Sequence, residues 1–231
     1  PATTLNITTT PANSGSYTVI STVSSCSSAV SNAVAVTINA LPLTTPVVAP
    51  ATTTVCSGST VTVNIAGSQA GINYELFDGV TSLSSPVAGT GGAINIVTSA
   101  LTANTTITVR ATNPTTTCTV LLSGTSVVTV TPIPPAPTVT PAGPVIVCEG
   151  SANIVLTSDA ATGNQWYKDG SPIGGETATT LNITTTPANT GSYTVISTVS
   201  SCSSAVSNAV AITINALPLT TPVVTPATPT I

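Results

Sequence analysis

The two ends of the chain carry the same sequence. Residues 177–231 repeat residues 1–55 at an offset of 176, with only 6 differences in 55 positions. The differences are mild, for example Ser14 against Thr190 and Val36 against Ile212. Long, nearly identical repeats are typical of arrays in which each unit mainly contacts its neighbours. We therefore expect the chain to be a cut from a tandem array in which two unlike domains of about 88 residues alternate.

The composition indicates β structure. The 231 residues include 49 threonines and are 41% hydrophobic, but only 3% are charged. Threonine, valine and isoleucine are β-branched and suit pleated strands better than helices. A hydrophobic content this high also argues against a disordered stalk. We therefore predict an all-β protein with almost no helix.

The charge balance excludes two classes of partner. A formal net charge of −4 with only two basic residues leaves no basic surface for nucleic acid or an anionic membrane. No apolar run approaches the roughly 18 residues that a membrane span needs. No signal peptide is recognisable, as expected for an internal segment. We expect no nucleic-acid partner and no membrane insertion.

Strand and turn signals divide the chain into four segments. The predicted boundaries are 1–42 for the C-terminal half of a domain, 43–132 for a second domain type, 133–218 for a complete domain, and 219–231 for the start of the next. In the second domain type, alternating apolar residues separated by Gly, Asn and Pro predict several strands. These strands are residues 60–65, 72–77, 93–97, 106–111 and 126–130, with a turn at Asp78-Gly79.

The complete domain carries the most specific pattern. Its predicted strands are residues 154–156, 165–168, 180–183, 193–195 and 209–214, with a hairpin turn at Asp169-Gly170. This order resembles the immunoglobulin superfamily, in which one strand buries a tryptophan and a later strand begins with a tyrosine corner. The resemblance implies a structural core of Leu156, Trp166, Tyr193 and Val195, with Tyr17 as the earlier copy of Tyr193. We predict tandem immunoglobulin-like β-sandwich domains in an extended rod.

Further motifs narrow the resemblance. Cys148-Glu149-Gly150, residues 191–195 and Ser201-Cys202-Ser203 resemble the immunoglobulin-like tandem repeats of giant surface adhesins from gliding, type IX-secreting Bacteroidetes. Residues 50–132 resemble a sister repeat of the same proteins. The likeness covers nearly the whole chain. It implies a location outside the cell, on a surface protein attached to the outer membrane, of the type of the flavobacterial gliding adhesin.

Five cysteines recur in two contexts. Cys56 and Cys148 lie early in their domains, whereas Cys26, Cys118 and Cys202 lie late. The chain has no His and no close Cys pair, which favours disulfides over zinc. One pairing closes each domain on itself, as Cys56–Cys118 and Cys148–Cys202. The alternative joins successive domains, as Cys56–Cys202, because the two ends of a sandwich lie too far apart for a disulfide.

Few residues offer chemistry. Catalysis needs a nucleophile and a base that converge, and the chain has no His, two basic residues and six acids. Glu75, Asp78 and Arg110 are more simply turn and strand residues, and Lys168 is more simply a solvated turn residue than half of an isopeptide bond. The triplets at Asn6, Asn104 and Asn182 match glycan-acceptor sequons, which Thr-rich strands also produce by chance. We expect no enzymatic activity, no cofactor and no metal site.

The function expected from these features is structural. We expect a stalk or spacer repeat of a large bacterial adhesin or surface filament, with a role in gliding motility and surface attachment. Its partners would be neighbouring repeats of the same chain and other copies in a filament. A tip outside this segment would contact polysaccharide or other surfaces. The alternative is an array that binds carbohydrate, or that serves a secreted enzyme as an accessory module.

Overall fold

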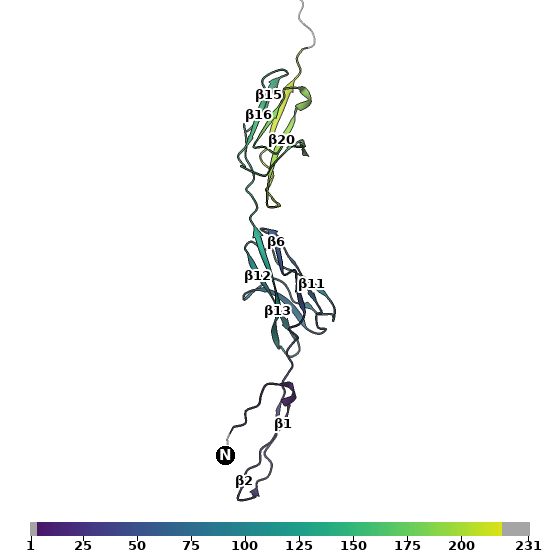
Figure 1. The fold of residues 1–231 in the computed structure, drawn as a ribbon, viewed down its shortest axis with the longest axis vertical. Coiled ribbons are helices and arrows are strands. Elements are labelled where there is room, and N and C mark those ends of the chain that lie inside the picture. The colour runs from purple at the N-terminus through teal and green to yellow at the C-terminus, as the bar shows by residue number, and fades with distance from the viewer. Residues whose placement is uncertain (1–3, 219–231) are drawn as a thin grey trace, which may run out of the picture. The chain divides into compact units, whose positions relative to one another are not determined.

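A computed structural model describes residues 4–218 of the chain. The polypeptide divides into two compact units, Pro1–Val130 and Thr131–Ile231. The predicted start of a further domain at residues 219–231 lies outside the described residues. The all-β prediction is confirmed, because the described residues form strands apart from two short 3-10 turns, η1 (Pro11–Asn13) and η2 (Pro187–Asn189) (Figure 1).

The second domain type is a sandwich of two sheets. One sheet has the order β11-β7-β5, and the other has the order β10-β8-β12-β13-β6 with β9 paired to β8. The strands of the first sheet are β5 (Val47–Ala49), β7 (Thr62–Ala66) and β11 (Ile94–Val97). Those of the second are β6 (Thr52–Cys56), β8 (Asn73–Asp78), β9 (Thr81–Ser82), β10 (Val87–Ala88), β12 (Thr105–Thr112) and β13 (Thr119–Thr131).

Strict alternation forms the core of this domain. Along β12, Ile107, Val109 and Ala111 are fully buried, while Thr108 and Arg110 between them are partly exposed. Successive side chains of a strand point to opposite faces, so each strand contributes every second residue to the space between the sheets. These residues form one hydrophobic cluster with those of the opposite sheet.

The complete domain is a second sandwich. Its sheets have the orders β14-β16-β19 and β15-β22-β20-β17-β18, with β21 paired to β20. The first contains β14 (Val139–Thr140), β16 (Ile154–Ser158) and β19 (Thr180–Ile183). The second contains β15 (Val145–Cys148), β17 (Asn164–Lys168), β18 (Ser171–Pro172), β20 (Gly191–Val199), β21 (Cys202–Ser203) and β22 (Val210–Asn215).

One pairing in this domain is parallel. Strand β15 runs alongside β22 in the same direction, with Val145 opposite Ile212 and Cys148 opposite Asn215. The other pairings printed for the domain's strands are antiparallel, including β17 with β20 and β20 with β22. An early strand of the domain therefore lies beside its last strand.

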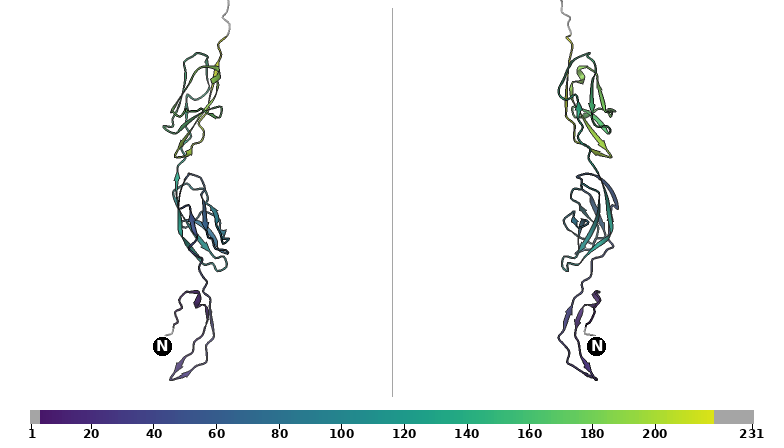
Figure 2. Two further views of the ribbon diagram at one scale, coloured as in Figure 1. Left: turned by 45° about the vertical axis from the view of Figure 1, so that its right-hand side comes forward. Right: turned by 90° about the vertical axis from the view of Figure 1, so that its left-hand side faces the viewer.

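Residues 4–42 reproduce part of this domain. They contain β1 (Gly15–Tyr17), β2 (Thr22–Val23), β3 (Cys26–Ser27) and β4 (Val34–Val36). Gly15 lies opposite Val36, just as Gly191 lies opposite Ile212. Among the described residues, no second sheet covers the β1–β4 ladder (Figures 1 and 2).

Candidate functional site

The only tryptophan lies inside the complete domain. Trp166 is 0% exposed and belongs to the same cluster as Leu156 and Val195. It lies on β17 directly opposite Val195 of β20. Its indole Nε1 donates a hydrogen bond to the carbonyl oxygen of Ala178 at 2.9 Å. A buried indole with its N–H satisfied stabilises the core and offers no platform to a sugar.

Both tyrosine corners bind backbone. The hydroxyl of Tyr193 donates to the carbonyl oxygen of Asn189 at 2.7 Å, and that of Tyr17 donates to Asn13 at 2.6 Å. Burial, and secondarily the negative charge of Asp169, raise the pKa of Tyr193 above the ordinary value of 10.0. The two copies therefore have the same hydrogen bond.

The environments of these two tyrosines differ. Tyr193 is a core residue at 2% exposure, whereas Tyr17 is only partly buried. The assignment of Tyr17 to a structural core needs correction, because no second sheet covers β1 in the described part of the chain. Its hydrogen bond persists because the 3-10 turn η1 that supplies the acceptor is local to residues 11–13.

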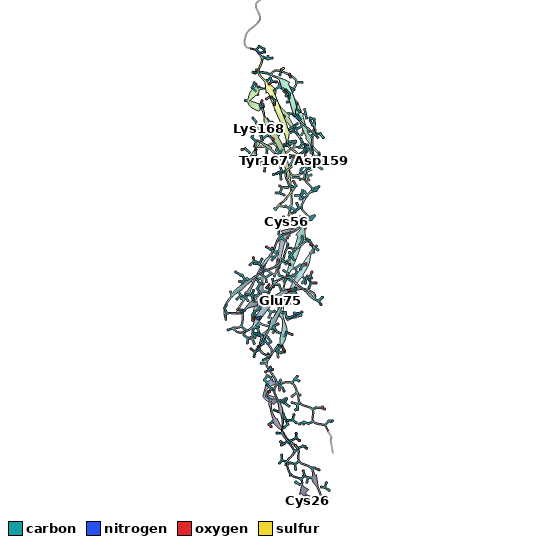
Figure 3. All side chains as sticks on the ribbon, turned by 180° about the vertical axis from the view of Figure 1, so that it is seen from behind. Cys26, Cys56, Glu75, Asp159, Tyr167 and Lys168 are labelled. Carbon is teal, nitrogen blue, oxygen red and sulfur yellow. The ribbon has the colours of Figure 1, made fainter. Side chains whose placement is uncertain are left out.

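The cysteines do not close each domain on itself. Cys56 and Cys202 form the disulfide of the structure, while Cys26, Cys118 and Cys148 are free thiols. The pairings Cys56–Cys118 and Cys148–Cys202 were therefore wrong, and Cys118 and Cys148 are not disulfide residues in this structure. Figure 3 shows Cys26 at the tip of the loop that carries β2 and β3.

Strand length explains the failure in the complete domain. Cys148 pairs with Asn215 at the end of β22, which lies level with the start of the antiparallel strand β20. Cys202 instead pairs with Val199, the last residue of β20. Strand β20 has nine residues, which places these cysteines on the order of 26 Å apart. A disulfide requires Cα atoms within about 7 Å.

The same reasoning holds in the second domain type. Beyond Cys56, the backbone N–H of Gly58 donates to the carbonyl oxygen of Leu101, shortly before β12 begins. Cys118 directly precedes Thr119, which pairs with the last residue of β12. Strand β12 has eight residues, so the two cysteines lie at opposite ends of the sandwich, roughly 23 Å apart.

The charged residues of the second domain type act in strand and turn contacts. Glu75 Oε1 accepts a hydrogen bond from Ser82 Oγ at 2.6 Å, and Asp78 Oδ2 accepts one from Thr105 Oγ1 at 3.1 Å. The guanidinium of Arg110 lies 3.8 Å above the ring of Phe77. A cation over an aromatic face is attracted by the ring's negative charge distribution. These contacts account for the three residues without assigning them chemistry.

The charged hairpin of the complete domain is equally committed. Asp169 and Gly170 have φ angles of 51° and 79°, which a tight two-residue hairpin turn requires. Asp169 Oδ1 accepts from the N–H of Ser192 at 2.8 Å, and Lys168 Nζ donates to the carbonyl oxygen of Ala188 at 2.5 Å. Lys168 is partly exposed (Figure 3) and holds a loop to the strand.

Surface grooves and sequons complete the candidates. A groove of about 190 Å³ on the complete domain is lined by Lys168, Glu176, Asn182 and Tyr193 together with apolar residues. It brings no nucleophile and base together. The sequon residues Asn6, Asn104 and Asn182 are all exposed, and Asn104 Oδ1 already accepts from the N–H of Val130 at 2.8 Å.

Two searches of the described residues return nothing. No three His, Cys, Asp or Glu side chains in residues 4–218 are grouped so that they would hold a metal ion. Within the same residues, no helix has the length and apolar character needed to cross a membrane.

Comparisons with known proteins give a likeness to tandem modules. No family model and no curated protein matches the chain. Among solved structures, an I-band fragment of titin is 14% identical, covering 89% of this chain and 76% of its own, with a TM-score of 0.40. Titin domains in complex with telethonin are 17% identical, covering 75% and 98%, with a TM-score of 0.32.

A bacterial structure is similar to the same degree. Fibronectin(III)-like modules of CbhA from Clostridium thermocellum are 16% identical, covering 74% of this chain and 92% of theirs, with a TM-score of 0.36. At these identities and TM-scores, the likeness supports no conclusion about ligand or partner. The assignment of immunoglobulin-like sandwiches rests on the strand order and on the buried tryptophan described above.

Proposed function

We propose that the chain is a stalk segment of a large bacterial surface adhesin or filament, of the kind found in gliding, type IX-secreting Bacteroidetes. In this role it holds an adhesive tip away from the cell and transmits tension. Its partners are neighbouring repeats of the same chain and other copies in the filament. A tip outside this segment contacts polysaccharide or other surfaces. The segment is extracellular and belongs to a protein attached to the outer membrane.

The parallel pairing of β15 with β22 is the observation that carries this proposal. Tension applied to the two ends of the complete domain pulls these neighbouring strands in opposite directions along their length. The hydrogen bonds of a parallel ladder are evenly spaced along the strands. All of them are therefore loaded together, rather than broken one at a time as in an unzipping hairpin. Such a domain resists extension along the chain.

The side chains support a passive role. The residues with chemical potential are occupied in local contacts, as described for Glu75, Asp78 and Lys168. Each sandwich has its own hydrophobic cluster of buried residues. A domain with its own core folds as an independent module, which suits repetition along a stalk.

Single-molecule stretching of the reduced chain tests the mechanical part. Glu149 N donates to Asn215 O at 2.8 Å, and by the alternation of a strand the N–H of Val147 also faces β22. Val147→Pro removes this donor, so we expect a lower unfolding force for the complete domain. Val147→Ala removes the side chain but keeps the N–H, and Ile146→Pro changes an N–H that points away from β22.

The controls decide the outcome. Both control variants should keep most of the unfolding force of the unchanged domain. Equal forces for Val147→Pro and the unchanged chain would show that the β15–β22 ladder does not resist extension.

Imaging and surface labelling test the biological part. Antibodies against residues 43–218, applied to intact cells, should label thin surface filaments in electron micrographs. Labelling of a compact secreted particle instead would contradict the stalk and favour an accessory role beside an enzyme.

A further inference from the structure

Residues 4–38 expose an apolar face that the later copy buries. The sequences of the two copies are nearly the same, so the contrast lies in what covers them. Three matched positions show it as exposed fractions: Leu5 70% against Leu181 3%, Val19 68% against Val195 0%, and Val34 57% against Val210 0%. An exposed cluster of this kind marks an interaction surface.

The backbone of residues 4–38 already has the conformation of the covered copy. The β1–β4 and β20–β22 ladders pair equivalent residues at an offset of 176. The β2–β3 pairing of Val23 with Cys26 likewise matches that of Val199 with Cys202. The two turns that follow have the same φ angles within a few degrees, 46° and 67° at Ser24 and Ser25 against 49° and 66° at Ser200 and Ser201.

The complete domain shows what covers this face. Val139, Leu156 and Trp166 belong to one cluster with Leu181, Val195 and Val210, and all six are buried. The same first half of the domain also supplies neighbours to both strands of the ladder. Strand β17 pairs with β20, and β15 pairs with β22. In the described residues, β1 and β4 have each other as partners and no further strand.

We propose that residues 4–38 are an acceptor for the first half of this domain type, and that a separate polypeptide with the sequence of residues 133–176 docks on them. The docked segment adds one strand to each edge of the β1–β4 ladder and covers its apolar face. This inference does not depend on the proposed stalk function.

The register of the complete domain predicts the contacts of the complex. Trp166 lies opposite Val195, so in the complex it lies opposite Val19. Val145 lies opposite Ile212, so it pairs with Val36. Added strands gain main-chain hydrogen bonds at the edges, while the apolar side chains give specificity.

The occupant is a free first half rather than a second complete chain. In a complete chain, residues 133–176 are already paired with residues 177–218. Exchange between two such chains would leave one second half uncovered for each that it covers. A free segment of residues 133–176 has no such competitor, so its docking buries new apolar surface.

Titration of the full chain with a labelled polypeptide of residues 133–176 tests the proposal. We expect one segment bound per chain, together with slower amide hydrogen exchange at residues 15–17 and 34–36. Val19→Asp in the full chain should weaken binding at least ten-fold. Val23→Asp is the matched control, because Val23 is 71% exposed and its counterpart Val199 is still 41% exposed in the complete domain. Its affinity should be unchanged.

A second variant places the change in the probe. Trp166→Ala in the labelled segment should also abolish binding, because Trp166 fills the centre of the covered face. Since Val19 and Val23 are both exposed, neither substitution should alter the thermal unfolding of the two complete sandwiches.

Three outcomes would overturn the proposal. The first is no binding by the segment. The second is binding that Val19→Asp leaves intact, which would place the segment elsewhere, for example by exchange into residues 177–218. The third is a chain that dimerises in sedimentation and becomes monomeric on Val19→Asp, which would make a second copy the occupant.

Discussion

Trp166 is the largest fully buried side chain of the complete domain, and its loss is expected to be costly. Trp166→Ala leaves a cavity between Leu156 and Val195 and removes the hydrogen bond to Ala178. We expect the free energy of unfolding to fall by about 3–5 kcal/mol. Urea titration of the full chain, followed at this domain, measures the change.

A neighbouring aromatic provides the control for this substitution. Tyr167 lies on the same strand but is only partly buried. Tyr167→Ala should therefore cost clearly less than Trp166→Ala. Equal losses at the two positions would mean that strand propensity, rather than core packing, determines the effect.

Tyr193 makes the stability of the same domain depend on alkaline pH. Its pKa is raised above 10.0 by burial and then by Asp169, so the folded state holds the phenol proton more tightly than the unfolded state. The resulting stability is complete below about pH 10 and is lost as the pH rises through the folded-state pKa. Tyr193→Phe should remove this decline and cost about 0.5–1.5 kcal/mol at neutral pH through the lost hydrogen bond.

Urea titrations at neutral pH and in steps above about pH 10 test this assignment. The unchanged chain and the Tyr193→Phe variant share all other titratable groups. If both lose stability with the same dependence on pH, the decline does not come from Tyr193.

Ser126 is a buried hydroxyl without a hydrogen-bond partner. It is 0% exposed, and its Oγ makes no hydrogen bond. An unsatisfied buried polar group costs about 1–3 kcal/mol. We therefore expect Ser126→Ala to stabilise the second domain type by about 1 kcal/mol, measured by thermal or urea unfolding.

Ser68 is the matched control in the same domain. It is 2% exposed, and its Oγ donates to the carbonyl oxygen of Gly92 at 2.6 Å. Ser68→Ala should destabilise the domain, opposite in sign to Ser126→Ala. A loss of stability in both variants would show that Ser126 contributes a favourable contact.

The core residues of the complete domain were accessible from sequence, but the buried serine was not. Trp166 and Tyr193 each stand in a motif with Gly and Asn turn residues beside them, so local pattern alone predicts their roles. Ser126 occupies an inward position of β13 only because Leu122 and Val128 on the same strand also face inward. Nothing in its immediate sequence distinguishes it from the exposed threonines around it.

At the scale of elements, antiparallel strands with clear alternation were predicted and short or parallel ones were missed. Residues 106–111 correspond to β12 and residues 72–77 to β8, each within one residue at either end. Both have hairpin turns or alternation that can be read locally. Strand β15 escaped detection because its partner β22 lies more than 60 residues away in the chain. No local turn signals a parallel pairing of that span.

Strand β13 shows a different failure. The prediction covered only residues 126–130, whereas the strand begins at Thr119. Ser123 and Gly124 resemble a turn, but β13 continues through them. A Cβ on Gly124 would lie 3.2 Å from the side chain of Val48, so the glycine marks a close approach of β13 to β5 instead of a turn.

At the scale of the whole molecule, the offset of 176 residues predicted the repeated backbone, while the cysteine pairing required the fold. Counting one early and one late cysteine per domain favoured closure within each domain. That count ignores strand direction, which separates the two cysteines by the length of a strand in both sandwiches. The topological objection was the sounder argument, because it followed from distance.

The Cys56–Cys202 disulfide gives the final prediction, which concerns extension under force. When the chain is pulled at its two ends, tension passes from Cys56 through the bond to Cys202. The roughly 145 residues between them then add nothing to the stretched length, even if both domains unfold. At about 3.5 Å per extended residue, the oxidised chain should extend roughly 500 Å less than the reduced chain. Cys202→Ser should extend fully under both conditions, and non-reducing peptide mapping of the unchanged chain should yield a linked peptide that contains Cys56 and Cys202. An oxidised chain that extends as far as Cys202→Ser would show that this bond does not carry the tension.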